Sequence, residues 1–161
     1  MADAECLTGC SGIPTFDASG SSSFVNLSTA FQIVYGSGQA VGTLGQDVVQ
    51  MAGFSVSNQV FATCDLVSSG LLSSPVSGLM GLAFQSIAAS KATPFWQTLV
   101  SQGAWDEPVM AFYLSRYVRK LISRNSGFDD LCAGLIMSVR RKPWNLAVHL
   151  IWVNLIRVVI L

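Results

Sequence analysis

The sequence predicts an all-β fold with one short helix, followed by a C-terminal tail of a different kind. Short alternating apolar segments separated by glycines fill residues 24–64. Hydrophobic residues make up 51% of the 161 residues and charged residues only 11%, a composition that excludes intrinsic disorder of the whole chain. The charge changes sign at Arg116, which separates the tail from the β-rich part.

The first β segments form a meander in the sequence. Residues 31–35 (FQIVY) alternate in the two-residue period of a half-buried strand. Residues 36–39 (GSGQ) predict a tight turn, because glycine supplies the backbone angles that such turns need. Residues 41–49 then return as a second strand, and residues 54–62 form a third.

Glycines inside the predicted strands indicate bulges or close approach of another backbone. Gly42 and Gly45 interrupt the second strand in this way. The apolar run at residues 76–84 (VSGLMGLAF) is broken by Gly78 and Gly81, and it predicts a buried strand with another backbone passing close to it.

One helix is expected, at residues 93–102. Thr93 is the expected N-cap, Pro94 fits the first turn and Gly103 fits the C-terminal exit. Residues 109–114 predict one more strand.

The charges divide the chain into two parts. Up to Ser115 there are seven acidic residues and one basic residue, whereas from Arg116 onward there are eight basic residues and two acidic ones. The formal net charge of 0 is the sum of these opposite halves, so no global field steers the chain toward nucleic acid. We expect no nucleic-acid partner.

The tail, residues 118–161, has no clean period, and we expect it to be helical or disordered. Residues 144–161 are apolar and follow the basic residues 140–142, as in a membrane anchor. Four polar residues interrupt that segment, including Arg157, and they share no single helix face. Membrane anchoring therefore stays an alternative, a buried or amphipathic helix another, and we favour a tail that is not part of the fold.

The cysteines and the single histidine do not form a metal-binding pattern. Cys6, Cys10, Cys64 and Cys132 contain no CxxC pair, and His149 stands alone, so neither a metal nor another cofactor is predicted. Cys6 and Cys10 are either a short disulfide loop or two free thiols. The first ten residues lack the basic and apolar regions of a signal peptide, so we expect either a cytosolic chain or a start that lies outside this sequence.

Residues 6–117 resemble the N-terminal lobe of pepsin-like aspartic proteases, most closely the secreted fungal type. The resemblance rests on blocks that follow one another in register at residues 31–45 (FQIVYGSGQAVGTLG), 46–49 (QDVV), 58–61 (NQVF), 78–84 (GLMGLAF) and 93–95 (TPF). It implies a partial pepsin-like lobe over residues 6–117 and an unrelated tail over residues 118–161.

The resemblance assigns roles to individual positions. Residues 31–45 look like the flap, a hairpin that closes over a bound peptide. Tyr35 matches the flap tyrosine that walls the specificity pocket, and Gly36, Ser37 and Gly38 match the positions whose backbone and hydroxyl groups bind the substrate main chain. Leu71 and Leu79 fall near positions that line the apolar pocket beside the cleavage point.

Two further features accompany the resemblance. Cys6 and Cys10 match the small disulfide loop of the family, which implies an oxidising, secreted location. Asn26-Leu27-Ser28 is an N-glycosylation sequon, so Asn26 is a candidate modification site.

The catalytic residues of the family are missing. Such enzymes hydrolyse peptides with two aspartates, each in an Asp-Thr/Ser-Gly triplet, which share a proton because two adjacent carboxylates cannot both stay ionised. None of the seven aspartates here begins such a triplet. We therefore expect no catalytic residue, a chain that begins after the first catalytic loop, and no activity of this chain alone.

The resemblance thus implies an aspartic endopeptidase that is monomeric and acts on peptides or proteins. A non-catalytic peptide-binding module and a membrane-anchored protein are the alternatives.

Overall fold

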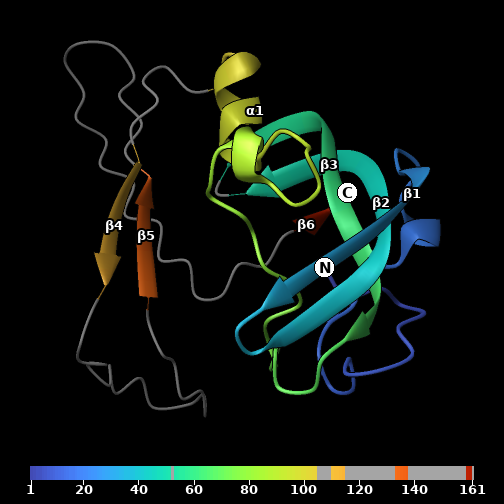
Figure 1. Cartoon of the computed structure of the whole chain (residues 1–161). Coiled ribbons are helices and arrows are strands. Elements are labelled where there is room, and N and C mark those ends of the chain that lie inside the picture. Colours follow the sequence, from blue (N-terminus) through green and yellow to red (C-terminus); the bar gives the residue numbers. More distant parts are fainter. Residues whose placement is uncertain (52, 105–109, 115–132, 138–158, 161) are drawn as a thin grey trace, which may run out of the picture. The chain divides into compact units, whose positions relative to one another are not determined.

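The computed structural model describes residues 1–51, 53–104, 110–114, 133–137 and 159–160. It confirms the all-β class, because every regular element except one short α-helix and two 3-10 turns is a strand (Figure 1). The elements are η1 (Ala18–Gly20), β1 (Val25–Tyr35), β2 (Gly38–Met51), β3 (Phe54–Val67), η2 (Gln85–Ile87), α1 (Phe95–Ser101), β4 (Met110–Leu114), β5 (Ala133–Met137) and β6 (Val159–Ile160).

The chain divides into two compact units. The larger one comprises Met1–Ala104 with Ile156–Leu161, and the smaller one comprises Trp105–Leu155. In the larger unit β1, β2 and β3 form an antiparallel sheet in that order, and β6 adds a short pairing to β2. In the smaller unit β4 pairs antiparallel with β5.

The meander predicted from the sequence is confirmed. β1 and β2 form a hairpin whose last pair is Tyr35 with Gly38, and β2 and β3 form a second hairpin that ends at Met51 and Phe54. Among the described strands, β2 is therefore the central one. β1 pairs on one side only, with β2, and lies at the edge of the sheet. Figure 1 shows the long β2 and β3 ribbons curving together, with β1 alongside β2 at the hairpin.

Gly42 and Gly45 lie where neighbouring groups come too close for a side chain, as predicted. A Cβ at Gly42 would collide with the carbonyl oxygen of Thr63, and the strand register shifts beside this position. A Cβ at Gly45 would collide with the ring of Phe24. That ring also packs against Phe16 and Phe61, with ring centroids 5.4 Å and 6.2 Å away.

The buried core of the sheet centres on Ala40, Cys64 and Val67. Phe31 and Ile33 on β1 pack against it, which explains the alternation in residues 31–35. The N-terminal segment lies along β3, where Ala2 and Thr8 form isolated parallel bridges with Cys64 and Leu66. Cys64 is buried and is free among the described cysteines.

The predicted buried strand at residues 76–84 is wrong. The run forms no strand, and three of its large side chains are exposed, among them Leu79 at 55% and Phe84 at 62%. Its backbone makes no ladder pairing within the described ranges, and an apolar run without a partner strand cannot complete its hydrogen bonds as a sheet.

The predicted helix is present but begins later than expected. α1 starts at Phe95 with Pro94 as its N-cap, and no side chain caps it. Thr93 is not the cap: its hydroxyl lies 3.3 Å from Oε1 of Gln85, and its carbonyl oxygen accepts a hydrogen bond from Gln59. Gly103 has φ +68°, the left-handed conformation expected at the helix exit.

The strand expected at residues 109–114 is confirmed as β4. In the tail, the described residues are strands β5 and β6, where the sequence predicted helix or disorder. Both short stretches find partner strands, which a periodicity search within the tail does not detect. Most of the apolar segment at residues 144–161 lies outside the described residues, so its prediction stays a prediction.

Candidate functional site

The predicted flap residues lie at the tip of the β1–β2 hairpin. Tyr35 is the last residue of β1, Gly36 and Ser37 form the turn, and Gly38 begins β2. Val34, directly before Tyr35, is 71% exposed, whereas Tyr35 is half-buried. The alternation of β1 therefore turns the Tyr35 ring toward the inside of the lobe and Val34 toward solvent.

Ser68 anchors the base of this tip. Its Oγ accepts a hydrogen bond from the backbone N of Gln39 at 2.9 Å, and its own backbone N donates to the carbonyl oxygen of Gln39 at 2.9 Å. Gly38 has φ +150°, and a Cβ there would lie 2.5 Å from the Ser68 Cβ. Glycine is therefore required at position 38 for close approach. Nothing in the sequence distinguishes Ser68, which lies in a serine-rich loop.

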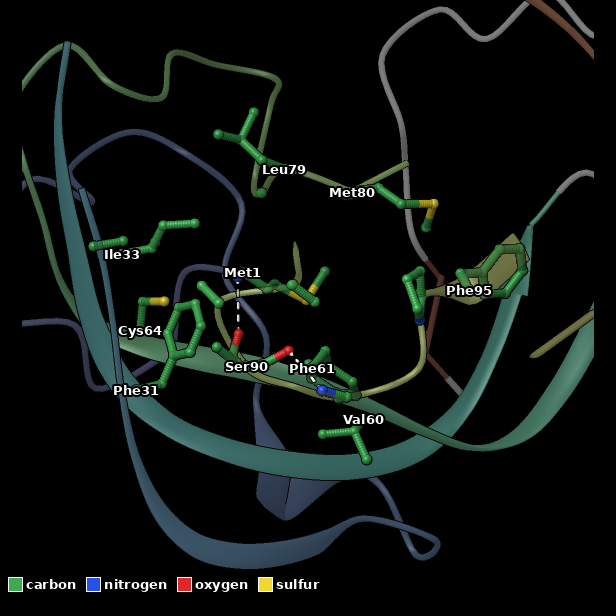
Figure 2. A pocket seen from close by; sticks show the side chains of 18 of the residues that line it. Met1, Phe31, Ile33, Val60, Phe61, Cys64, Leu79, Met80, Ser90 and Phe95 are labelled. Atoms are coloured by element: carbon green, nitrogen blue, oxygen red, sulfur yellow. Dashed lines mark hydrogen bonds between the residues drawn. The ribbon is translucent and has the colours of Figure 1, made fainter. Parts of the chain in front are cut away.

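An apolar pocket of about 360 Å³ lies beside the hairpin (Figure 2). Figure 2 shows Phe31, Ile33 and Cys64 grouped on one side of it, with Leu79 and Met80 above. The lining includes Tyr35, Leu71 and Leu79, so the structure brings three of the predicted site residues to one pocket. Gly36, Ser37 and Gly38 are not among its lining residues and remain at the hairpin tip.

The Tyr35 side chain is partly desolvated. Burial raises the pKa of the Tyr35 phenol above its ordinary value of 10.0, and the electrostatic interaction with Cys64 adds to the rise. Because both causes disfavour the phenolate, Tyr35 is a neutral phenol at any physiological pH. It can present an apolar ring and a hydroxyl to a ligand.

No carboxylate is among the residues described as lining this pocket. Asp47 is buried, at 2% exposure, but its oxygens are already engaged. Oδ2 accepts from the hydroxyl of Ser21 at 2.7 Å, and Oδ1 accepts from the hydroxyl of Ser23 and from the backbone N of Val48. Asp47 thus ties the segment before β1 to β2, which is a structural role.

The other predicted site residues, Cys6, Cys10 and Asn26, do not line the pocket. Cys6 and Cys10 form a disulfide with their Cα atoms 6.1 Å apart. Asn26 is exposed near the start of β1. Among the described residues no three His, Cys, Asp or Glu side chains cluster in a way that could hold a metal ion. The same part of the chain contains no helix that is long and apolar enough to cross a membrane.

The family model that matches this sequence is described as eukaryotic aspartyl protease, and it covers residues 1–126. The chain belongs to the eukaryotic aspartyl protease family. Major aspartyl peptidase 1 of Cryptococcus neoformans is 59% identical over 108 residues, which are 67% of this chain and 22% of the relative. Pepsin A of Sus scrofa is 39% identical over 107 residues, which are 66% of this chain and 28% of the relative.

A third relative, Vacuolar protease A of Arthroderma otae, is 39% identical over 102 residues, or 62% of this chain and 26% of the relative. The chain therefore spans only about a quarter of the length of the curated relatives it matches. Membership in the family supports peptide hydrolysis as the chemistry of the group.

Proposed function

We propose that this chain carries the flap and one apolar wall of the substrate cleft of an aspartic endopeptidase. The observation that supports the proposal is the convergence of Tyr35, Leu71 and Leu79 on one apolar pocket under a β-hairpin tip. An apolar substrate side chain would enter this pocket and remove its surface from water.

The hairpin tip suits the main chain of an extended peptide. Such a peptide presents a row of N–H and C=O groups, which a hairpin can meet as an added strand. Gly36 leaves the backbone of the tip open to this approach, because no atom lies within 4 Å of the place a Cβ would take, and the Ser37 hydroxyl adds a donor and an acceptor. We therefore assign main-chain binding to Gly36, Ser37 and Gly38, and the pocket to Tyr35, Leu71 and Leu79.

The chain alone does not hydrolyse peptides under this proposal. General acid–base catalysis needs a carboxylate that can activate water, and no aspartate of the sequence begins an Asp-Thr/Ser-Gly triplet. Incubation of the chain with casein at acidic pH should leave casein intact. Cleavage that pepstatin inhibits would contradict this part of the proposal.

A chimera tests the endopeptidase role directly. Residues 1–104 would replace the matching segment of the Cryptococcus neoformans peptidase behind its first Asp-Thr/Ser-Gly triplet. We expect the chimera to cleave casein with pepstatin sensitivity, because the flap and pocket would be completed by the missing carboxylates. A folded chimera without activity would contradict the proposal.

Tyr35→Ala in that chimera should reduce kcat/KM at least tenfold, since it removes both a pocket wall and the ring that covers the substrate. Val34→Ala is the matched control, because Val34 is the neighbouring hairpin residue and points to solvent. Equal activities of the two variants would remove Tyr35 from the site.

A peptide-binding role without catalysis is the second candidate, favoured by a pocket that has no carboxylate among its described lining residues. It predicts that the chain by itself binds a fluorescent extended apolar peptide and loses that affinity with Tyr35→Ala. The chimera distinguishes the two candidates. The endopeptidase role predicts that the chimera cleaves its substrate, whereas the binding role predicts that the substrate stays intact.

The Cys6–Cys10 disulfide also supports a location in an oxidising compartment, such as the secretory pathway. Thiol labelling of the exported chain should leave Cys6 and Cys10 unmodified until a reductant is added. Free thiols at both positions in the exported protein would contradict this assignment.

A further inference from the structure

The sequon at Asn26 has a conformation that presents its side chain for modification. Asn26-Leu27-Ser28 is the only Asn-X-Ser/Thr triplet in the sequence. All three residues are exposed, and they lie near the start of the edge strand β1. Neither the pocket nor the hairpin tip uses them.

The backbone at the sequon leaves the regular ladder. Asn26 pairs with Gly45 and Thr29 pairs with Leu44, so Leu27 and Ser28 form a bulge with no partners on β2. Ser28 has φ +54°, the left-handed conformation, and its backbone N donates to Oδ1 of Asn26 at 2.7 Å. This hydrogen bond closes a local turn in which Asn26 remains exposed.

The local turn engages only one of the two polar atoms of the exposed Asn26 side chain. Oδ1 of Asn26 is occupied by the Ser28 backbone, whereas Nδ2 makes no hydrogen bond to any described residue. Because the turn depends only on contacts within the triplet, it can form in the nascent chain before the sheet does.

We propose that Asn26 carries an N-linked oligosaccharide when the chain passes through a secretory pathway. The donor is an oligosaccharide joined to a lipid through a pyrophosphate. A bond forms between Nδ2 of Asn26 and the anomeric carbon of the first sugar, while the bond from that carbon to the phosphate oxygen breaks. The electron pair leaves with the lipid pyrophosphate, and one amide proton passes to a base of the transferase.

The fold tolerates a glycan at this position. Phe24, two residues earlier, is held in the aromatic cluster with Phe16 and Phe61, and the ladder resumes at Thr29. Asn26 lies at the opposite end of β1 from Tyr35, so the glycan would stay away from the pocket.

Among the described residues β1 pairs on one side only, with β2, and a glycan at Asn26 would also cover its open edge. Strand edges expose backbone groups that pair with other chains, and proteins protect them in several ways. Here the exposed edge carries Val25 and Leu27, which are apolar and accessible. A hydrated oligosaccharide beside them would block strand pairing between two copies.

The test uses the full 161-residue chain behind a cleavable leader, translated in the presence of microsomes so that leader cleavage reports entry. We expect a slower band that an N-glycosidase collapses, with an aspartate left at position 26 in the peptide mass spectrum. Asn26→Gln and Ser28→Ala should each abolish the slower band, whereas Thr29→Ala, a hydroxyl loss just outside the triplet, should keep it.

A processed chain with an unmodified Asn26 would overturn the proposal, as would a slower band that survives in Asn26→Gln. The protective role has its own readout. The glycosylated chain should remain monomeric at concentrations where the enzymatically deglycosylated chain aggregates, and equal aggregation of the two would overturn that role.

Discussion

Two glycine-containing apolar stretches behave differently in this molecule. Residues 31–45 form the end of the β1–β2 hairpin with a continuous register from Phe31 and Gly42 to Tyr35 and Gly38. Residues 76–84 form no strand, and Leu79, Leu82 and Phe84 are exposed. Both stretches have the composition of strands, yet only one carries its partner strand in the adjacent sequence.

The difference shows what a strand requires beyond side-chain pattern. A two-residue turn places the partner of Tyr35 directly after it, so backbone hydrogen bonds form locally. The 76–84 run is followed by the 3-10 turn η2 and by α1 rather than by a strand. Its backbone contacts the N-terminal segment through a hydrogen bond from Ala2 N to the Ser77 carbonyl oxygen at 2.8 Å. An apolar run therefore becomes a strand only where a partner is supplied.

Truncating one leucine in each stretch gives the largest expected contrast. Leu44→Ala in β2 should lower the free energy of unfolding by about 2–5 kcal/mol, because Leu44 is buried and the truncation leaves a cavity. Leu79→Ala should change it by no more than about 0.5 kcal/mol, because Leu79 is mostly exposed. Urea denaturation measures both values, and equal losses would show that the 76–84 run is packed as a strand after all.

Adding one methyl group in each stretch sharpens the contrast. Gly42→Ala should destabilise the fold by about 1–3 kcal/mol, because the new Cβ would meet the Thr63 carbonyl and the Cys64 backbone, which cannot move aside. Gly81→Ala is the control, since no atom lies within 4 Å of the new Cβ. Its unfolding free energy should stay equal or rise by about 0.4–1 kcal/mol through the loss of unfolded-state entropy. A neutral Gly42→Ala would contradict the close approach of β2 and β3.

The smallest expected effect is a rise in the pKa of Tyr35 at the hairpin tip. With Tyr113 and Tyr117 replaced by phenylalanine, phenolate absorbance should give a midpoint for Tyr35 above 10.0, first because of burial and second because of Cys64. Cys64→Ala should lower the midpoint but leave it above 10.0. Since the fold favours the neutral phenol, this part of the stability is present at lower pH and is lost as pH rises through the folded pKa. A midpoint at or below 10.0 would place Tyr35 in solvent.

Much of the sheet could be predicted from the sequence, because its strands and turns depend on patterns within a few neighbouring residues. The alternation in residues 31–35, the turn at Gly36 and Ser37, and the close approach at Gly42 and Gly45 each depend on a period or on a residue with special geometry. The sequence predicts the start of α1 at Thr93, but the Thr93 hydroxyl is engaged by Gln85, eight residues earlier, in a contact that the local pattern does not indicate.

The site was predictable in part. The likeness of residues 31–45 to a flap indicated Tyr35 to Gly38, and the structure adds that Tyr35, Leu71 and Leu79 share one pocket. Ser68 and Gln59 could not be found, because their roles come from contacts made by folding: Ser68 holds Gln39, and Gln59 donates to the Thr93 carbonyl beside α1. Ordinary serines and glutamines in a loop or strand give no such signal.

The pair of hydrogen bonds between Ser68 and Gln39 fixes where the hairpin arm can bend. Both backbone groups of Gln39 are held by Ser68, the residue that follows β3, so we expect any opening motion to pivot between Gln39 and the turn. The moving part would then be the short segment from Tyr35 to Gly38 rather than the whole hairpin. Admission of a ligand would need only a small swing of that segment, and the sheet behind it would keep its shape.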